Sequence, residues 1–65
     1  MRYEIRVDGH LSETLKCAFP ELDQVVMSGQ TVLFGHVIDE AHLYELLDRC
    51  QNLGLRLMEM RQLPE

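Results

Sequence analysis

The stretch that decides the fold runs from Gly29 to Leu63, GQTVLFGHVIDEAHLYELLDRCQNLGLRLMEMRQL. Its first part, from Gln30 to Ile38, is rich in β-branched and apolar residues and follows a Ser28-Gly29 pair. A strand entered through a tight hairpin is therefore predicted, since glycine adopts the positive φ that such turns require.

A helix is predicted directly after this strand. Asp39 can accept hydrogen bonds from the first free amides of a helix, and Gly54 suits the left-handed position just past its end. Between them apolar residues recur at helical spacing: Leu43, Leu46, Leu47, Cys50 and Leu53. The segment from Arg56 to Gln62 then predicts another strand, and Pro64 ends the ordered pattern.

The N-terminal half repeats this order of elements. From Arg2 to Val7 charged and apolar residues alternate, which is typical of a half-buried strand. Ser12 to Phe19 predicts a short helix that Pro20 ends, because proline disfavours helical geometry in the preceding residue. Leu22 to Met27 predicts the strand that leads into the hairpin.

The resulting order βαββαβ predicts a single α+β domain over residues 1–65, a ferredoxin-like two-layer sandwich. Right-handed crossovers give an antiparallel sheet in the order 4-1-3-2 with both helices on one face. The core predicted from these elements consists of Tyr3, Ile5, Val7, Leu15, Phe19, Leu33, Val37, Leu43, Leu46, Leu47, Cys50 and Leu57.

The sheet face without helices is expected to be partly apolar. We assign Leu33, Gly35 and Val37 to the core side, which turns Val32 and Phe34 to the open face. Met58 and Met60 are expected on the same face, with Arg2, Glu4, Arg6 and Arg56 around them. Monomers seldom expose such a patch, so it predicts an interface. The alternative is that a bulge shifts the alternation by one residue.

Charge narrows the classes of partner. The formal net charge is −5, which disfavours a general nucleic-acid binder. The longest apolar run is far shorter than a membrane span, and the N-terminus carries no signal-peptide pattern, so a cytoplasmic location is expected. Because the first and last strands are expected to be neighbours, Arg2, Arg6 and Arg56 form a candidate anion-binding group.

No catalytic or metal-binding pattern stands out. His10, His36 and His42 with the two cysteines lack the ligand spacing of zinc motifs, and His42 is expected on the solvent side of its helix. Cys17 and Cys50 fall on apolar helix faces, so we expect two buried, unlinked thiols and no exposed nucleophile. No enzyme activity, cofactor or metal is predicted.

Part of the chain resembles a group of short uncharacterised bacterial proteins. The segment from Gly29 to Leu47 fits their pattern GxTxLxGxVxDxAxLxxLL, and Leu53-Gly54-Leu55 fits the LGL that follows. The resemblance covers the C-terminal half and implies a bacterial origin. It carries no functional residue, because each matched position has a structural explanation.

Two functions from different classes follow. The first is an oligomerising interaction or scaffold module, a homodimer or higher assembly that uses the open sheet face, with pairing at a strand edge as the competing geometry. The second is an ACT-like sensor that binds an anionic metabolite at a dimer interface through the arginines. The expected partner is a second copy or another protein, and neither nucleic acid nor membrane is expected.

Overall fold

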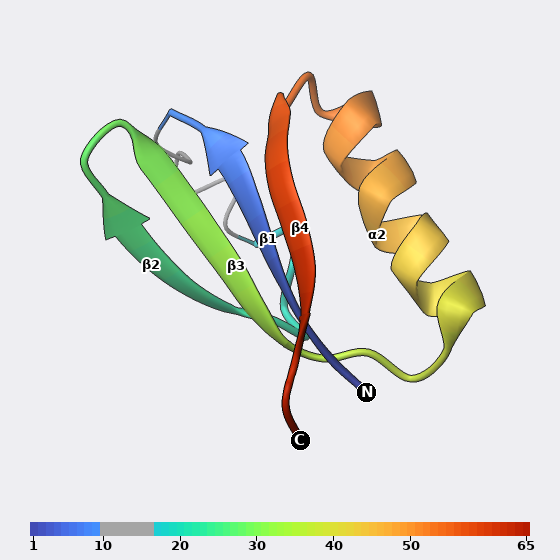
Figure 1. Ribbon diagram of the computed structural model, residues 1–65. Helices are drawn as coiled ribbons and strands as arrows, with labels where there is room; N and C mark the ends of the chain where they lie inside the picture. Colours follow the sequence, from blue (N-terminus) through green and yellow to red (C-terminus); the bar gives the residue numbers. More distant parts are fainter. Residues whose placement is uncertain (10–16) are drawn as a thin grey trace.

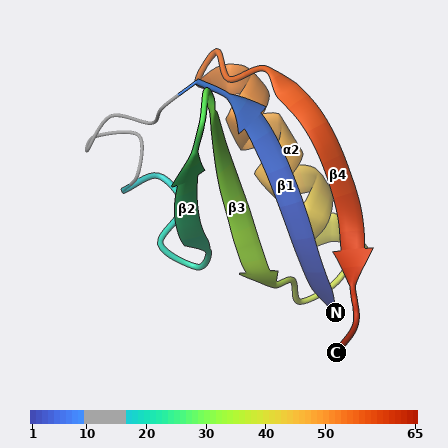
Figure 2. The ribbon, with the colours of Figure 1, turned by 60° about the vertical axis from the view of Figure 1, so that its left-hand side comes forward.

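In the computed structural model, residues 1–9 and 17–65 are described. The strands are β1 (Arg2–Asp8), β2 (Asp23–Met27), β3 (Gln30–His36) and β4 (Leu57–Leu63), and the helix is α2 (Glu40–Asn52). The strands form one sheet in the order β2-β3-β1-β4, the predicted order read from the other edge, and all neighbours are antiparallel. Helix α2 covers one face of this sheet (Figures 1 and 2).

Capping and turn residues close in sequence account for helix α2 and for the hairpin between β2 and β3. Asp39 is the N-cap of α2, and its Oδ1 accepts a hydrogen bond of 2.8 Å from the His42 amide. Gly54 has a φ of 74°, and its amide donates to the Gln51 carbonyl, which closes the helix as predicted. The hairpin pair Met27–Gln30 closes the Ser28-Gly29 turn, where Gly29 has a φ of 72°.

The core lies between α2 and the sheet. Its strand residues Ile5, Val7 and Leu33 are fully enclosed, and α2 contributes Leu46 and its neighbours from the other side. The buried apolar residues are Ile5, Val7, Phe19, Leu22, Val32, Leu33, Val37, Leu43, Leu46 and Cys50. Most of the predicted core is thus confirmed, while Tyr3 and Leu47 are only half-buried and Leu15 lies outside the described residues.

Leu57 was wrongly placed in the core. Leu57 is 46% exposed, because β4 is the edge of the sheet. Leu22, which was not in the predicted core, is 8% exposed and lies against Gly35. A Cβ on Gly35 would come within 3.3 Å of Leu22 Cδ2. Glycine at this position therefore leaves room for Leu22, in the segment before β2, to pack against β3.

The predicted first helix, Ser12 to Phe19, falls largely outside the described residues. Its described end, residues 17–19, is a turn followed by irregular chain. Cys17 there is exposed, which corrects the expectation that both thiols are buried on helices, whereas the expectation that they are unlinked is confirmed. The smaller differences are at strand ends: β2 begins at Asp23, and β3 ends at His36 before the Asp39 cap.

Candidate interaction surface

The sheet face opposite α2 is set by the alternation of β1. Ile5 and Val7 point to the core, so Glu4 and Arg6 point to the open face. The register then places Phe34 opposite Glu4 and Val32 opposite Arg6 on β3. Asp23, Val25 and Met27 of β2 continue this face, as do Glu59, Arg61 and Leu63 of β4.

One half of the open face, over β2 and β3, is apolar. Val25 lies opposite Val32, and Asp23 lies opposite Phe34. Val32 is 5% exposed although α2, the helix among the described residues, lies on the other face of the sheet (Figure 1), whereas Val25 and Met27 are each 47% exposed. A shallow depression of about 270 Å³ opens here, lined by Glu4, Arg6, Val25, Met27, Val32, Phe34 and Leu63.

The other half, over β1 and β4, is charged and internally paired. Arg61 Nε lies 2.8 Å from Glu4 Oε2, and Arg6 Nε lies 3.4 Å from the same oxygen. Glu59 lies opposite Arg6 across the β1–β4 ladder. Acidic and basic side chains therefore alternate across the two strands, so this half carries little net charge.

The register of β4 corrects the predicted open-face patch. Val32 and Phe34 lie on that face, but Met60 lies opposite Ile5 and therefore on the side of α2. The cause is a bulge: Arg6 pairs with Glu59 and Val7 with Leu57, which leaves Met58 as the extra residue. The alternation along β4 changes at Met58, as the bulge alternative allowed.

The candidate anion-binding arginines do not converge. Arg2 lies opposite Leu63 at one end of β1, and Arg6 is engaged by Glu4 nearer the other end. Arg56 precedes β4, where its backbone carbonyl accepts the Asp8 amide at 3.0 Å. Carboxylates stand between these side chains, so the geometry offers an anion no common site.

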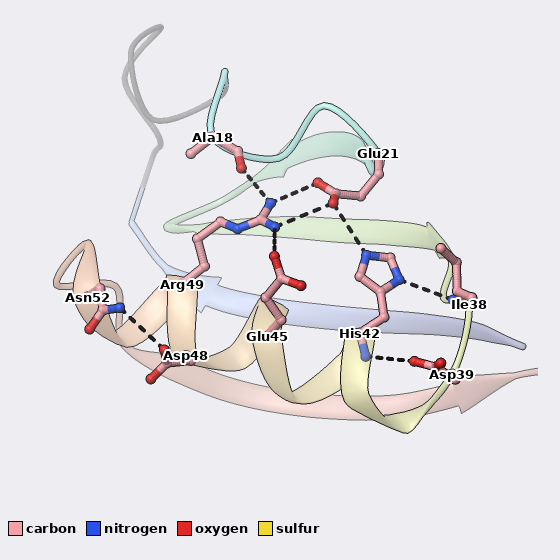
Figure 3. A network of polar contacts seen from close by, with 9 residues as sticks. All are labelled: Ala18, Glu21, Ile38, Asp39, His42, Glu45, Asp48, Arg49 and Asn52. Atoms are coloured by element: carbon pink, nitrogen blue, oxygen red, sulfur yellow. Dashed lines mark hydrogen bonds and ion pairs between the residues drawn. The ribbon is translucent and has the colours of Figure 1, made fainter.

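A polar network on the other side of the molecule was largely missed by the sequence analysis (Figure 3). Arg49 Nη1 donates to the Ala18 carbonyl at 2.7 Å and to Glu21 Oε1 at 2.8 Å. Arg49 Nη2 donates to Glu45 Oε1 at 3.0 Å, an i,i+4 pair that the sequence does reveal. The guanidinium also lies 5.5 Å from the centre of the Phe19 ring, a cation–π contact.

His42 belongs to this network and is not on the solvent side of α2 as predicted; its side chain is 13% exposed. The Ile38 amide donates to His42 Nδ1 at 3.1 Å, so the neutral ring carries its proton on Nε2, which faces Glu21 Oε2 at 3.3 Å. Both His42 and Arg49 thereby hold Glu21 against α2. This arrangement fixes the segment before β2.

The electrostatics agree with a structural role. The hydrogen bond from Arg49 is the main cause that lowers the pKa of Glu21 below its ordinary value, and the same bond raises the pKa of Arg49. Burial raises the pKa of the Cys50 thiol, which favours its protonated form. Within residues 1–9 and 17–65, no three metal-ligating side chains form a group. No helix in this part of the chain has the length and apolar character needed to cross a membrane.

Comparison with known proteins adds a family. A domain of unknown function (DUF8691) matches residues 2–61 of the chain. Neither the curated proteins nor the solved structures gave a match.

Proposed function

We propose that this chain, which belongs to the DUF8691 family of domains of unknown function, is a small interaction module that self-associates through the open face of its sheet. The observation that carries the proposal is the depression of about 270 Å³ on the open face, whose apolar lining includes Val32 and Phe34 of β3. Two copies packed face to face would cover it, as sheets do in a β-sandwich.

Charge favours a second copy as the partner on this face. The whole chain has a formal net charge of −5, whereas the open face sets three arginines against four carboxylates. The remaining surface therefore carries most of the excess negative charge and repels another copy. Two copies meet with less repulsion through the open face, where Glu4 is paired with Arg6 and Arg61 within each chain.

Size supports the same conclusion. A domain of 65 residues has a small core and gains stability from a partner subunit. A typical stable interface buries about 800 Å² on each partner, which is about one fifth of the 4174 Å² surface of this chain. One broad face of the sheet supplies that area.

Light scattering of Phe34→Lys tests the proposal. Phe34 lies between Glu4 and Asp23 on the neighbouring strands, so lysine there gains favourable neighbours within one chain but places a charge inside the interface. We expect the wild type to have a multiple of the 7.6 kDa chain mass at micromolar concentration and Phe34→Lys to lose a two-fold association. Val25→Lys on β2, where the side chain is already half-exposed, should do the same.

Tyr44→Lys is the matched control. Tyr44 is 63% exposed on α2, away from the open face, so its change to lysine should leave the mass unaltered. Circular dichroism melts of all variants show whether each remains folded. A wild-type mass of one chain, or an unchanged mass in Phe34→Lys and Val25→Lys, would rule out the face-to-face module.

The complete βαββαβ order, the cytoplasmic location and the bacterial origin remain predictions. The complete ferredoxin-like βαββαβ order depends on a first helix at residues that lie outside the described part. The cytoplasmic location and bacterial origin rest on sequence composition and on the resemblance described above. A direct role in catalysis is not proposed, since the polar network holds two segments together.

A further inference from the structure

The strand β4 is an exposed edge of the sheet. Among residues 1–9 and 17–65 it pairs only with β1, and every residue from Leu57 to Gln62 is exposed. Leu57, Met58 and Met60 are 46%, 51% and 38% exposed. A long edge strand with apolar side chains is a template for pairing with another strand, which proteins usually block.

The unpaired backbone groups of this edge can be assigned. The Asp8 amide donates to the Arg56 carbonyl at 3.0 Å, whereas the Gly9 amide donates to Gly29 on the other side of β1. Even-numbered residues of β1 therefore bond toward β4, where Glu59 and Arg61 are the partners of Arg6 and Glu4. Met60 and Gln62, which alternate with those partners, direct their amides and carbonyls away from β1, toward the free edge.

The sequence of β4 is complementary to itself in the antiparallel direction. In a pair centred on Met60, Glu59 lies opposite Arg61 of the second copy, and Arg61 lies opposite Glu59 of the second copy. Centring the pair on Glu59 or on Arg61 would instead set like charges directly opposite each other, which is unfavourable. Met60 is also a residue whose own backbone groups point outward, so the same register forms reciprocal hydrogen bonds between the two Met60 residues.

From this edge we infer a second homotypic interface: two copies pair antiparallel through β4, centred on Met60, and join their sheets into one of eight strands. The contact is isologous, with its two-fold axis perpendicular to the sheet. Both α2 helices then lie on the same side of the joined sheet, together with the two Met60 side chains. The inference goes beyond the proposed function, because it uses the edge of the sheet and leaves the open face available.

Two substitutions at Met60 test the edge. Met60→Lys places two ammonium groups beside each other across the axis, and the exposure of Met60 makes lysine acceptable in a single chain. Met60→Pro removes an amide that has no partner within the sheet, a position where an edge strand tolerates proline. Met60→Leu keeps both the amide and the apolar side chain and is the control.

We expect light scattering to show that Met60→Lys and Met60→Pro each halve the assembled mass, while Met60→Leu matches the wild type. Amide hydrogen exchange supplies a readout specific to this edge. The Met60 and Gln62 amides should be protected in the wild-type assembly and should exchange rapidly in Met60→Lys, while the Ile5 amide stays protected. Circular dichroism melts check that each variant is folded.

The inference is overturned if the Met60 and Gln62 amides of the assembled wild type exchange as unprotected amides, or if both Met60→Lys and Met60→Pro retain the wild-type mass. Neither result affects the face-to-face proposal, which Phe34→Lys tests on a different strand. Conversely, an unchanged mass in Phe34→Lys together with loss of association in Met60→Lys rejects the open face and supports the edge.

Discussion

At the scale of single residues, Arg49 joins two segments that lie far apart in the sequence. Its side chain is 24% exposed, and it satisfies the Ala18 carbonyl while it also binds Glu21 and covers Phe19. Exposed ion pairs contribute little stability by themselves. Here the pair is combined with a hydrogen bond to the backbone and a contact to a buried ring, so the segment before β2 depends on it.

Acid should weaken this contact through Glu21. The pKa of Glu21 is lowered in the folded protein, so its contribution to stability is present above its ordinary value of 4.5 and is lost as the pH falls through the folded pKa. We expect Glu21→Gln to destabilise the protein at pH 7 and to differ less from the wild type at pH 4. Urea unfolding of both proteins at the two pH values measures the difference. A gap that stays constant or widens in acid would contradict this account.

Leu46 tests the packing of the core. Its side chain is fully buried between α2 and the sheet, so Leu46→Ala removes contacts and leaves a cavity. The expected loss in the free energy of unfolding is about 2–5 kcal/mol. Leu53→Ala, at a position 36% exposed at the end of α2, is the matched control and should cost much less in the same denaturation experiment. Equal losses would mean that the core is not centred on Leu46.

At the scale of elements, α2 is stabilised at both ends by local groups. Asp39 accepts from the His42 amide, Glu40 lies in the first turn, and the Leu53 and Gly54 amides close the last turn. The order of polar and apolar residues from Asp39 to Gly54 is thus sufficient to define this helix. Its placement on the sheet, in contrast, needs the buried stripe of Leu43, Leu46 and Cys50.

Removal of the cap should destabilise α2 specifically. Asp39→Ala leaves the His42 amide without its acceptor, and the expected loss is about 1 kcal/mol. Asp39→Asn keeps an accepting oxygen and should retain most of the stability. Thermal unfolding followed by circular dichroism compares the three proteins. A loss as large in Asp39→Asn as in Asp39→Ala would show that the charge, and not the hydrogen bond, is what matters.

At the scale of the whole molecule, the two proposed interfaces would have perpendicular symmetry axes. The edge contact needs an axis perpendicular to the sheet, whereas face-to-face packing needs an axis that lies parallel to it. When the two axes intersect, the smallest closed assembly that satisfies both is a tetramer, in which two eight-stranded sheets pack against each other. Such an assembly covers both the depression around Phe34 and the edge at Met60.

A double variant separates the two surfaces. We expect four chains for the wild type, two chains each for Phe34→Lys and Met60→Lys, and one chain for the combination, by light scattering at one fixed concentration. The steps should be additive, since the two positions lie on opposite faces of the sheet. A double variant that keeps the mass of either single variant would mean that the two substitutions disrupt the same contact.

The sequence by itself determined the four strands, helix α2 and the order of the strands in the sheet. Alternation defined β1, the Ser28-Gly29 pair defined the hairpin, and the Asp39 cap with its apolar stripe defined α2. These signals act within a few residues, so they can be read without the rest of the chain. The strand order followed from them, because short connections and right-handed crossovers leave few arrangements.

Only the tertiary structure decided which side chains share a surface. The bulge at Met58 turned Met60 to the α2 side, and its position depends on how β4 pairs with β1. Likewise, Glu21 meets Arg49 although 28 residues separate them. Burial of Val32 and exposure of Leu57 depend on their places in the sheet, at a central strand and at an edge. A contact between distant residues has no local pattern, so the candidate surfaces could be assigned only once the strands were paired.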